Sequence, residues 1–385
     1  MHLSCGNKLQ SKNVWIQQRE NNAVRLTYGK TKQILSEYKN VSMLYLDASG
    51  EQIVIDTLFD KCFEIEHLRV VQQSNAKVYQ ISNHSFSKSS FADDSESKKI
   101  DSLCDYVDTL STKKCGLIRY NRINNNKQFF KKLDDKINTI NGDDNCIGWF
   151  GNVRGINRFE SCDTLIVLGQ HRIADYGIFN LSQLIFREDI ADAKQQFEEV
   201  CYSKYLAKEL MTKVYRMKDG EHREIEQYEY ATAECRYTSN HFDKAETYQA
   251  LHRLRLLHGD DDKQLLIFTD AVLDISIDAL LDKNKELGEK NIQVLKHIKE
   301  KHFLVDTDDA FVDAFKWNAN EAKRFRGRRE NGYWLQNHRA LTHWRYKTKD
   351  RKTGKVYSSK TQADDDVKYF LENKVGLEVK MVEKV

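Results

Sequence analysis

Two short segments of the chain carry residue types that could handle a phosphate group. The first is WFGNVRGINRFESCDTLIVLG, residues 149–169, which places Gly151, Arg154 and Gly155 in a loop ahead of an apolar run. Glycine lets the backbone approach a phosphate closely, and arginine can bind a phosphate through two hydrogen bonds. Taken alone, these residues favour the simpler interpretation, a tight turn that carries an arginine on its surface.

The second segment is ETYQALHRLRLLH, residues 246–258, which has glutamine and arginine at helical spacing. Gln249 and Arg253 are four residues apart and share one face of a helix, and Arg255 projects from another. Such a helix could hold a guanidinium against a γ-phosphate and stabilise the charge that develops during phosphoryl transfer. An amphipathic basic helix without this role is the alternative.

Apolar runs that alternate with helical segments predict the scaffold that positions these residues. The runs typical of buried strands are 43–46, 76–81, 115–120, 147–150, 164–169 and 264–269. The segments with helical spacing are 52–59, 100–111, 190–215, 246–257 and 284–302, the last of which we expect to be solvated. This alternation predicts an α/β fold with a parallel sheet and helices on both faces. The Ser-, Asp- and Lys-rich stretch 82–99 is predicted to be a linker.

The composition excludes several classes of protein. The chain has 385 residues, of which 40% are hydrophobic and 31% charged, a balance typical of a globular protein. Its longest apolar runs are far shorter than the ~20 residues of a membrane span, and no secretory signal is readable at its start. The eight cysteines are scattered without a C-x-x-C motif, which argues against a zinc site or a disulfide framework. We therefore expect a cytoplasmic protein that contacts no membrane.

A basic region near the C-terminus predicts an anionic partner. Residues 316–355 carry thirteen Lys or Arg and three acidic residues, interleaved with aromatic residues. Cations neutralise phosphates, and exposed aromatic rings can stack on unpaired bases. A solvated basic face whose aromatic residues form a small core is the alternative. The nucleic-acid contacts that we predict are Arg324, Arg326, Arg328, Arg329, Trp334, Trp344, Arg345 and Lys347.

In their order along the chain, these pieces resemble the second half of a superfamily 2 helicase. A strand ending in LDAS (46–49) precedes CGLIRY (115–120); GNVRG then precedes TLIVLG, and QALHRLR precedes QLLIFT. The resemblance covers about residues 41–280 and is greatest to helicase-like proteins carried by plasmids, phages and integrated elements. It implies a RecA-like sheet, here followed by a small basic accessory domain.

The resemblance also implies roles for the candidate site residues. Gln249 would couple the nucleotide to motion, and Arg253 would be the arginine finger. His252 stands where the family has glycine, and Arg255 falls one position before the family's second arginine, which leaves its role open. The residues that match the loop coupling the ATP cleft to the nucleic-acid track are Gly151, Arg154, Gly155 and Asn157.

The implied domains are the end of a preceding RecA-like domain with a linker (1–95), a second RecA-like domain (96–283) and a basic accessory region (284–385). No GxxxxGK[ST] phosphate loop or DEAD-type acid pair precedes residue 41. ATP and Mg²⁺ would therefore be held mainly by an N-terminal helicase half, supplied in cis or in trans, and no metal ligands are expected in this chain.

The function expected from the resemblance is the C-terminal half of an ATP-dependent DNA helicase or translocase that is inactive alone. It would act on single-stranded or forked DNA in the replication of a mobile genetic element. The alternative is a non-catalytic nucleic-acid-binding protein on the same scaffold. A third pattern, Asp366 with Glu378-Val379-Lys380, resembles the acid and E-x-K residues of metal-dependent nucleases.

Overall fold

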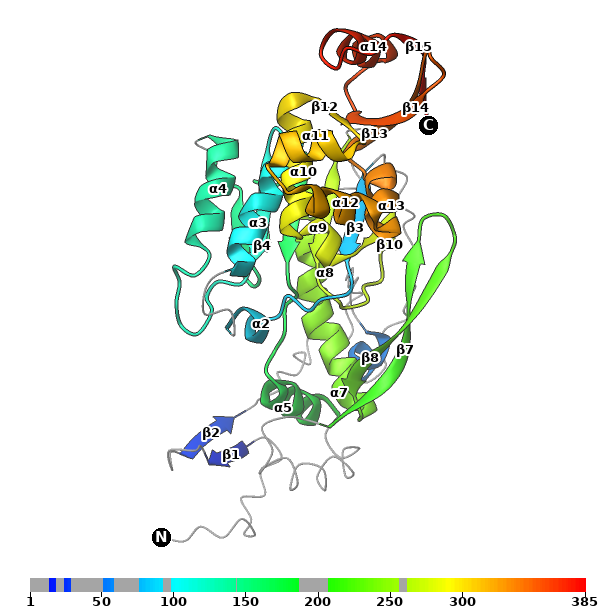
Figure 1. Ribbon diagram of the computed structural model, residues 1–385. Coiled ribbons are helices and arrows are strands. Elements are labelled where there is room, and N and C mark those ends of the chain that lie inside the picture. The colour runs from blue at the N-terminus through cyan, green and yellow to red at the C-terminus, as the bar shows by residue number, and fades with distance from the viewer. Residues whose placement is uncertain are drawn as a thin grey trace.

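A parallel sheet of six strands lies at the centre of the molecule (Figure 1). The computed structural model describes residues 14–18, 24–28, 51–58, 76–92, 98–142, 144–186, 207–255 and 262–385. The strands of this sheet, in spatial order, are β11 (Ala279–Leu281), β3 (Lys77–Ile81), β9 (Gln264–Phe268), β6 (Thr164–Leu168), β4 (Cys115–Arg119) and β5 (Ile147–Trp149), and every neighbouring pair is parallel.

Helices cover both faces of the sheet, so its central strands are buried on both sides. Every residue of β4 and β6 is buried, as expected for continuous apolar runs in a parallel sheet. Ile166 and Leu168 face α3 (Lys98–Thr109), α4 (Lys131–Asn141) and α10 (Glu289–Lys301), and Leu165 and Val167 face α8 (Ala245–Leu251). The predicted α/β fold with a covered parallel sheet is confirmed.

Most of the predicted elements are present. The strand predictions at 76–81, 115–120, 147–150, 164–169 and 264–269 correspond to β3, β4, β5, β6 and β9. The helix predictions at 52–59, 100–111 and 246–257 correspond to α1 (Gln52–Leu58), to α3, and to α8 with the 3₁₀ turn η4 (His252–Leu254). The predicted strand 43–46 and the LDAS motif lie outside the described residues. An antiparallel hairpin of β1 (Val14–Gln18) and β2 (Val24–Tyr28) was not predicted.

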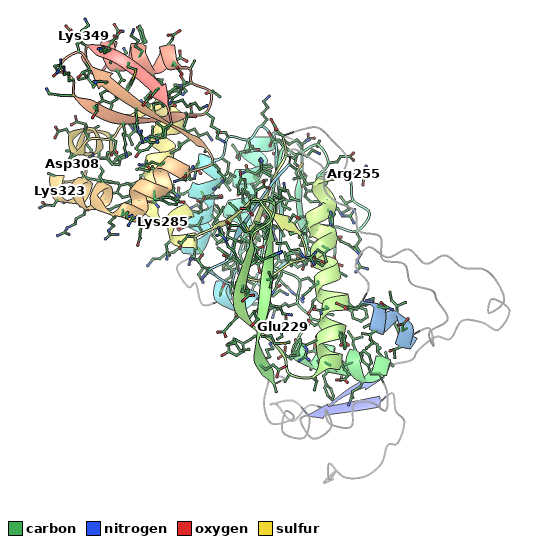
Figure 2. The ribbon with its side chains drawn as sticks, turned by 90° about the vertical axis from the view of Figure 1, so that its right-hand side faces the viewer. Glu229, Arg255, Lys285, Asp308, Lys323 and Lys349 are labelled. Carbon is green, nitrogen blue, oxygen red and sulfur yellow. The ribbon has the colours of Figure 1, made fainter. Side chains whose placement is uncertain are left out.

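The helix prediction for 190–215 is wrong where the structure describes it. Residues 208–217 form β7 (Lys208–Met217), which pairs antiparallel with β8 (His222–Tyr230), and β10 (Ser276–Ile277) joins the other edge of β7. The physical reason is the period of two near the end of β7, where Tyr215 and Met217 are buried and Arg216 between them is exposed. In Figure 2 this hairpin, which carries Glu229, runs beside a long helix.

That long helix is built from α7 (Ala233–Ser239), the π-helical turn η3 (Asn240–Lys244), α8 and η4. α5 (Asp175–Phe186) packs against α7 and α1. The predicted linker 82–99 also contains packed structure, because α2 (Lys88–Ala92) buries Phe91 and the turn before it buries Phe86, both in the core below α3. These two phenylalanines attach residues 86–92 to that core.

The C-terminal region forms a second, antiparallel sheet with its own helices, seen at the top of Figure 1. Its strands, in spatial order, are β12 (Phe303–Val305), β14 (Thr353–Ser359), β13 (Leu341–Thr348) and β15 (Val379–Lys384). α14 (Asp364–Asn373) packs on this sheet around the buried Trp344. The helices α11 (Asp308–Phe315), α12 (Ala319–Gly327) and α13 (Arg329–Asn337) form a further core with α10 around Phe311.

Packed elements of the same sheet or core lie on both sides of the domain boundaries expected near residues 95 and 283, and residue 95 itself lies outside the described residues. β3 precedes the first boundary, yet it pairs with β9 and β11 of the same sheet. α9 (Lys283–Glu286) spans the second boundary and α10 follows it, yet Ile292 of α10 packs in the core of the parallel sheet. α10 is not a solvated helix, because apolar residues at every third or fourth position are buried between its exposed lysines and glutamates.

Candidate functional site

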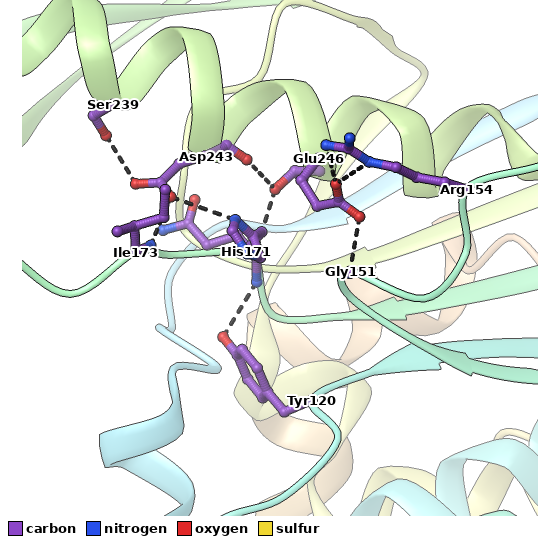
Figure 3. Close-up of polar contacts among 10 residues, drawn as sticks. Tyr120, Gly151, Arg154, His171, Ile173, Ser239, Asp243 and Glu246 are labelled. Carbon is purple, nitrogen blue, oxygen red and sulfur yellow. Dashed lines mark hydrogen bonds and ion pairs between the residues drawn. The ribbon is translucent and has the colours of Figure 1, made fainter. Parts of the chain in front are cut away.

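The carboxyl ends of β4, β5 and β6 bring several loops together (Figure 3). The chain leaves β4 toward its neighbour β5 at the edge of the sheet, and it leaves β6 toward β9 on the opposite side. Ligands of open α/β sheets bind at the carboxyl ends of strands where neighbouring connections diverge in this way. The loop that contains Gly151 and Arg154 follows β5, so the structure places these predicted residues at this edge.

Glu246 of α8 holds the loop after β5. Its Oε1 accepts a hydrogen bond from the amide of Gly151 at 2.8 Å, and its Oε2 accepts one from Nε of Arg154 at 2.8 Å. A second guanidinium nitrogen lies 2.7 Å from Oε2. The side chain of Glu246 is 4% exposed and that of Arg154 is 64% exposed. Glu246 therefore neutralises the arginine that was predicted to bind phosphate, and it ties this loop to α8.

The backbone conformation of this loop explains why glycine occupies two of its positions. Gly151 has φ +84° and Gly155 has φ +69°, values in the left-handed region that side chains disfavour, and no atom would obstruct a Cβ at either position. Asn157, further along the loop, is exposed, and its carbonyl accepts a hydrogen bond from the amide of Glu160. The glycines thus turn the chain, which agrees with the simpler interpretation of their spacing.

Arg253 and Arg255 lie at the opposite ends of the strands, the amino ends. α8 runs antiparallel to the strands, so η4 approaches the amino end of β9, where Lys263 donates to the carbonyl of Leu254. Arg255 has φ 52° and pairs with Glu160 at 3.1 Å. Nε of Arg253 is buried and has no hydrogen-bond partner among the described residues.

Glu246, Gln249 and Arg253 nevertheless share one face of the helix, because they are spaced three and four residues apart. Gln249 is half-buried between the other two. At 1.5 Å of rise per residue, Arg253 lies about 10 Å from Glu246 along the helix axis. α8 therefore connects the loop after β5 to the predicted finger residue.

A buried carboxylate in the π-helical turn holds the loop after β6. Asp243 accepts hydrogen bonds from the amide of Ile173 at 2.6 Å and from the hydroxyl of Ser239 at 3.0 Å, and Nδ1 of His171 lies 3.4 Å from its Oδ1. Thr247 completes the cluster by accepting a hydrogen bond from the amide of His171 at 3.1 Å. Single π-helical turns are frequent at functional sites, because the extra residue redirects side chains.

Tyr120, at the end of β4, contacts the same loop. Its hydroxyl accepts a hydrogen bond from the amide of Gln170 at 3.2 Å, and a Cβ on Gly169 would lie 2.4 Å from that hydroxyl. Burial raises the pKa of Tyr120 to about 12, so the phenol stays protonated near neutral pH. None of Tyr120, His171 or Asp243 was predicted. The feature of the sequence that could have indicated this cluster is the polar pair Gln170-His171 directly after the most apolar strand.

The space between this cluster and the β7–β8 hairpin is small. A cavity of about 60 Å³ is lined by His171, Arg172, Lys208, Glu229 and Lys244, among others. This volume holds a water molecule or two and is far below that of a nucleotide pocket. No group of three or more His, Cys, Asp or Glu residues able to hold a metal ion occurs in the part of the chain that the structure describes.

The C-terminal candidates divide into exposed and structural residues. Arg324, Arg328 and Arg329 are exposed, at the end of α12 and the start of α13. Arg326 instead pairs with Asp306 at 2.7 Å and also with Asp308, the first residue of α11, so it secures α12 to the start of α11. Arg345 is exposed and Lys347 half-buried on β13, away from α14.

The two tryptophans predicted to stack on bases are buried. Trp344 is 1% exposed and donates a hydrogen bond to Ser358; Trp334 is 9% exposed and donates one to Glu286. A buried ring offers no face to a base, so this part of the prediction requires correction. Tyr333, the residue before Trp334, is 70% exposed and is the aromatic side chain that α13 presents to solvent.

Replacing Arg154 with alanine is expected to lower the free energy of unfolding by about 1–3 kcal/mol, because it leaves the buried carboxylate of Glu246 without its charge partner. Adding Glu246→Gln should recover part of this loss, because a neutral amide is less costly to bury than an unpaired carboxylate. Urea unfolding of both variants measures the effect. If the double variant loses as much free energy of unfolding as the two single substitutions added together, this role of Glu246 is contradicted.

No protein-family model matches the chain, and searches of curated proteins and of solved structures return no significant match. No helix in the described ranges has the length and apolar character needed to cross a bilayer.

Proposed function

We propose that the chain is the second RecA-like half of a superfamily 2 DNA helicase or translocase, with a C-terminal region that holds the DNA. The order of its motifs and its parallel sheet with helices on both faces support this proposal. The observation that carries it is the pairing of Glu246 with Arg154 and Gly151, because it joins the two segments that the resemblance assigns to coupling.

In this proposal Arg253 contacts the γ-phosphate of an ATP held by the other helicase half. That half also supplies Mg²⁺, which would neutralise phosphate charge during transfer. Arg253 is half-buried in η4 and has no ion pair among the described residues, which leaves its guanidinium charge available to an anion. Arg255 is held by Glu160 and has no such role. When the two helicase halves close around ATP, α8 would shift, and the loop after β5 would move with it because Glu246 binds that loop.

The C-terminal region would bind DNA through a basic corner, which we define as Lys323, Arg324, Arg328 and Arg329. These four side chains are exposed, and none has an ion pair among the described residues. Arg328 and Arg329 stand at the N-terminus of α13, where the helix dipole disfavours cations and favours anions. Two unfavourably placed arginines beside the exposed Tyr333 support a phosphate-binding role.

The test is ATP hydrolysis by the chain alone, by a protein that supplies the phosphate loop, and by both together, with and without single-stranded DNA. The first candidate for that protein is the product of the open reading frame immediately upstream. We expect hydrolysis that needs both proteins and is stimulated by DNA. Robust hydrolysis by the chain alone would contradict the proposal.

A non-catalytic nucleic-acid-binding protein on this scaffold is the second candidate. The basic corner favours it, because DNA binding there requires no nucleotide. It predicts that the chain binds DNA with the same affinity whether or not the other helicase half and ATP are present. Nucleotide-dependent affinity would decide for the translocase.

Tyr333→Ala is expected to weaken binding of single-stranded DNA by about 1–3 kcal/mol without changing its salt dependence, because stacking releases no counterions. Charge reversal of Arg328 and Arg329 should instead flatten the slope of log K against log salt by about 0.7 for each phosphate that the protein no longer neutralises. Fluorescence anisotropy over a salt series measures both effects.

The matched control for Tyr333 is Tyr369→Ala, since Tyr369 is 62% exposed on α14. Point substitutions are preferable to truncating the chain near residue 310, because that cut would remove most of the core around Phe311. If the two tyrosine substitutions weaken DNA binding equally, the basic corner is not part of the DNA-binding site.

A further inference from the structure

A cavity of about 500 Å³ lies in the seam between the parallel sheet and the C-terminal region. Its walls come from the amino ends of β3 and β9, the end of α3, the last turns of α10, the segment that leads into β13 and the segment that ends and follows β14. The amide of Ser359 donates a hydrogen bond to the carbonyl of His302 at 3.2 Å, which fixes the end of β14 beside the end of α10. The cavity is therefore formed by elements from both regions.

Positive charge dominates this cavity. Asp262 is the acidic residue among the described residues that line it, and the cationic or basic residues are Lys77, Lys263, Lys299, His302, His338, Arg339 and Lys360. Of these, Lys77 is paired with Asp278 at 3.3 Å and Arg339 with Glu286 at 2.6 Å, so the excess charge comes from Lys263, Lys299 and Lys360. An excess of one sign of charge in a recess raises the local concentration of ions of the opposite sign.

Two of these lysines are positioned without being neutralised. Lys299 donates to the carbonyls of Asp108 and Leu110 at 2.7 and 2.6 Å, and Lys263 donates to those of Glu160 and Leu254 at 2.8 and 3.0 Å. Carbonyl groups carry no net charge, and each ammonium retains a third donor. Lys360 is exposed at the rim and has no ion pair among the described residues.

The remaining surface of the cavity is apolar. Leu110, Leu295, Ile298 and Leu341 line it together with the ring of Tyr79. Arg339 lies 5.2 Å over that ring and is bound by Glu286, so it forms part of the wall and its charge is compensated. A recess of a few hundred Å³ with apolar walls and a few polar groups is typical of a small-molecule site.

We propose that this cavity binds a phosphorylated small molecule of about the size of a nucleoside monophosphate. Lys299, Lys360 and His302 would contact its phosphate, and the apolar wall would contact its body. The volume and the mixture of apolar and cationic surface favour such a ligand over a DNA strand, which tracks along an open groove. This inference does not rest on the proposed function.

The experiment is isothermal titration of the full chain with AMP and, separately, with adenosine. We expect AMP to bind at least about tenfold more tightly than adenosine, because the excess positive charge is matched only by the phosphate. Lys360→Glu should weaken AMP binding by about tenfold or more, and Lys360→Arg should retain it. Because Lys360 is exposed and makes no ion pair in the described structure, these variants should fold like the parent, which thermal unfolding checks.

The matched control is Lys131→Glu, the same charge reversal at an exposed position at the start of α4, outside the cavity and outside the basic corner, which should leave AMP binding within about twofold. The proposal is overturned if AMP does not bind, if Lys360→Glu has no effect, or if Lys131→Glu weakens binding equally. A single-stranded oligonucleotide that loses affinity in Lys360→Glu while AMP fails to bind would assign the cavity to DNA instead.

Discussion

Replacing Arg253 with alanine is expected to lower kcat for DNA-stimulated ATP hydrolysis by about 10³-fold while leaving DNA binding nearly unchanged. An arginine finger acts mainly in the transition state of phosphoryl transfer, so its loss appears in kcat rather than in affinity. Arg255→Ala should reduce kcat by less than about tenfold. Arg255 is 41% exposed and paired with Glu160, which already occupies its charge.

The two variants are a matched pair, because both remove one arginine from the same short segment. Steady-state ATP hydrolysis with the nucleotide-binding half present measures kcat, and anisotropy with labelled single-stranded DNA measures affinity. Equal and mild effects of both substitutions would favour an amphipathic helix without a catalytic role. In that case the non-catalytic binding protein becomes the better proposal.

Replacing Arg339 with alanine is expected to lower the free energy of unfolding by about 3–5 kcal/mol, because it leaves a buried carboxylate without its charge partner. The side chains of Arg339 and Glu286 are 10% and 3% exposed, and the pair is joined at 2.6 Å. Arg339 also donates to the hydroxyl of Tyr106 and lies over the rings of Tyr79 and Tyr106. The substitution therefore weakens packing against α3 and β3 as well as the attachment to α9.

Acidification provides a second measurement of this pair. Burial would raise the pKa of Glu286, but Arg339 and His338 outweigh burial and lower it to about 2. The stabilisation by the pair is therefore complete above about pH 4.5 and is lost as the pH falls toward 2. Without Arg339 the carboxyl becomes protonated at higher pH, so the difference between parent and variant should narrow on acidification.

Urea unfolding of the parent and of Arg339→Ala at pH 7 and near pH 3 tests both the loss of stability and its dependence on pH. The control is Arg324→Ala. Because Arg324 is exposed, its replacement should lower the free energy of unfolding by less than about 0.5 kcal/mol. If Arg339→Ala lowers the free energy of unfolding by no more than this control does, the pair of Arg339 and Glu286 contributes little to stability.

The parallel strands could be predicted because burial on both faces leaves a continuous apolar run, as in residues 115–118 and 164–168. The hairpin strand at 208–217 could not be predicted in the same way, since most of its residues are exposed and its charged residues obscure the period of two. Helical content was also clear in α10, but its burial was not, because lysines and glutamates outnumber its apolar residues.

Site residues were harder to predict, because their contacts join distant parts of the chain. Glu246 and Arg154 are 92 residues apart in the sequence, and no local pattern encodes their meeting. In the basic region, composition identified aromatic residues among cations but not their directions. Trp334 and Tyr333 are neighbours on α13 and lie about 100° apart around the helix, which buries one and exposes the other.

The sharing of α10 between two cores bears on how the two regions can move. Ile292 belongs to the core of the parallel sheet, and Val294, Leu295 and Ile298 belong to that of the C-terminal region. A hinge needs a few residues that absorb a change of backbone angles without breaking packed contacts, and α10 has no such residues between these two sets. The two regions should therefore rotate together as one rigid body, so that a strand held at the basic corner would be displaced with the sheet rather than relative to it.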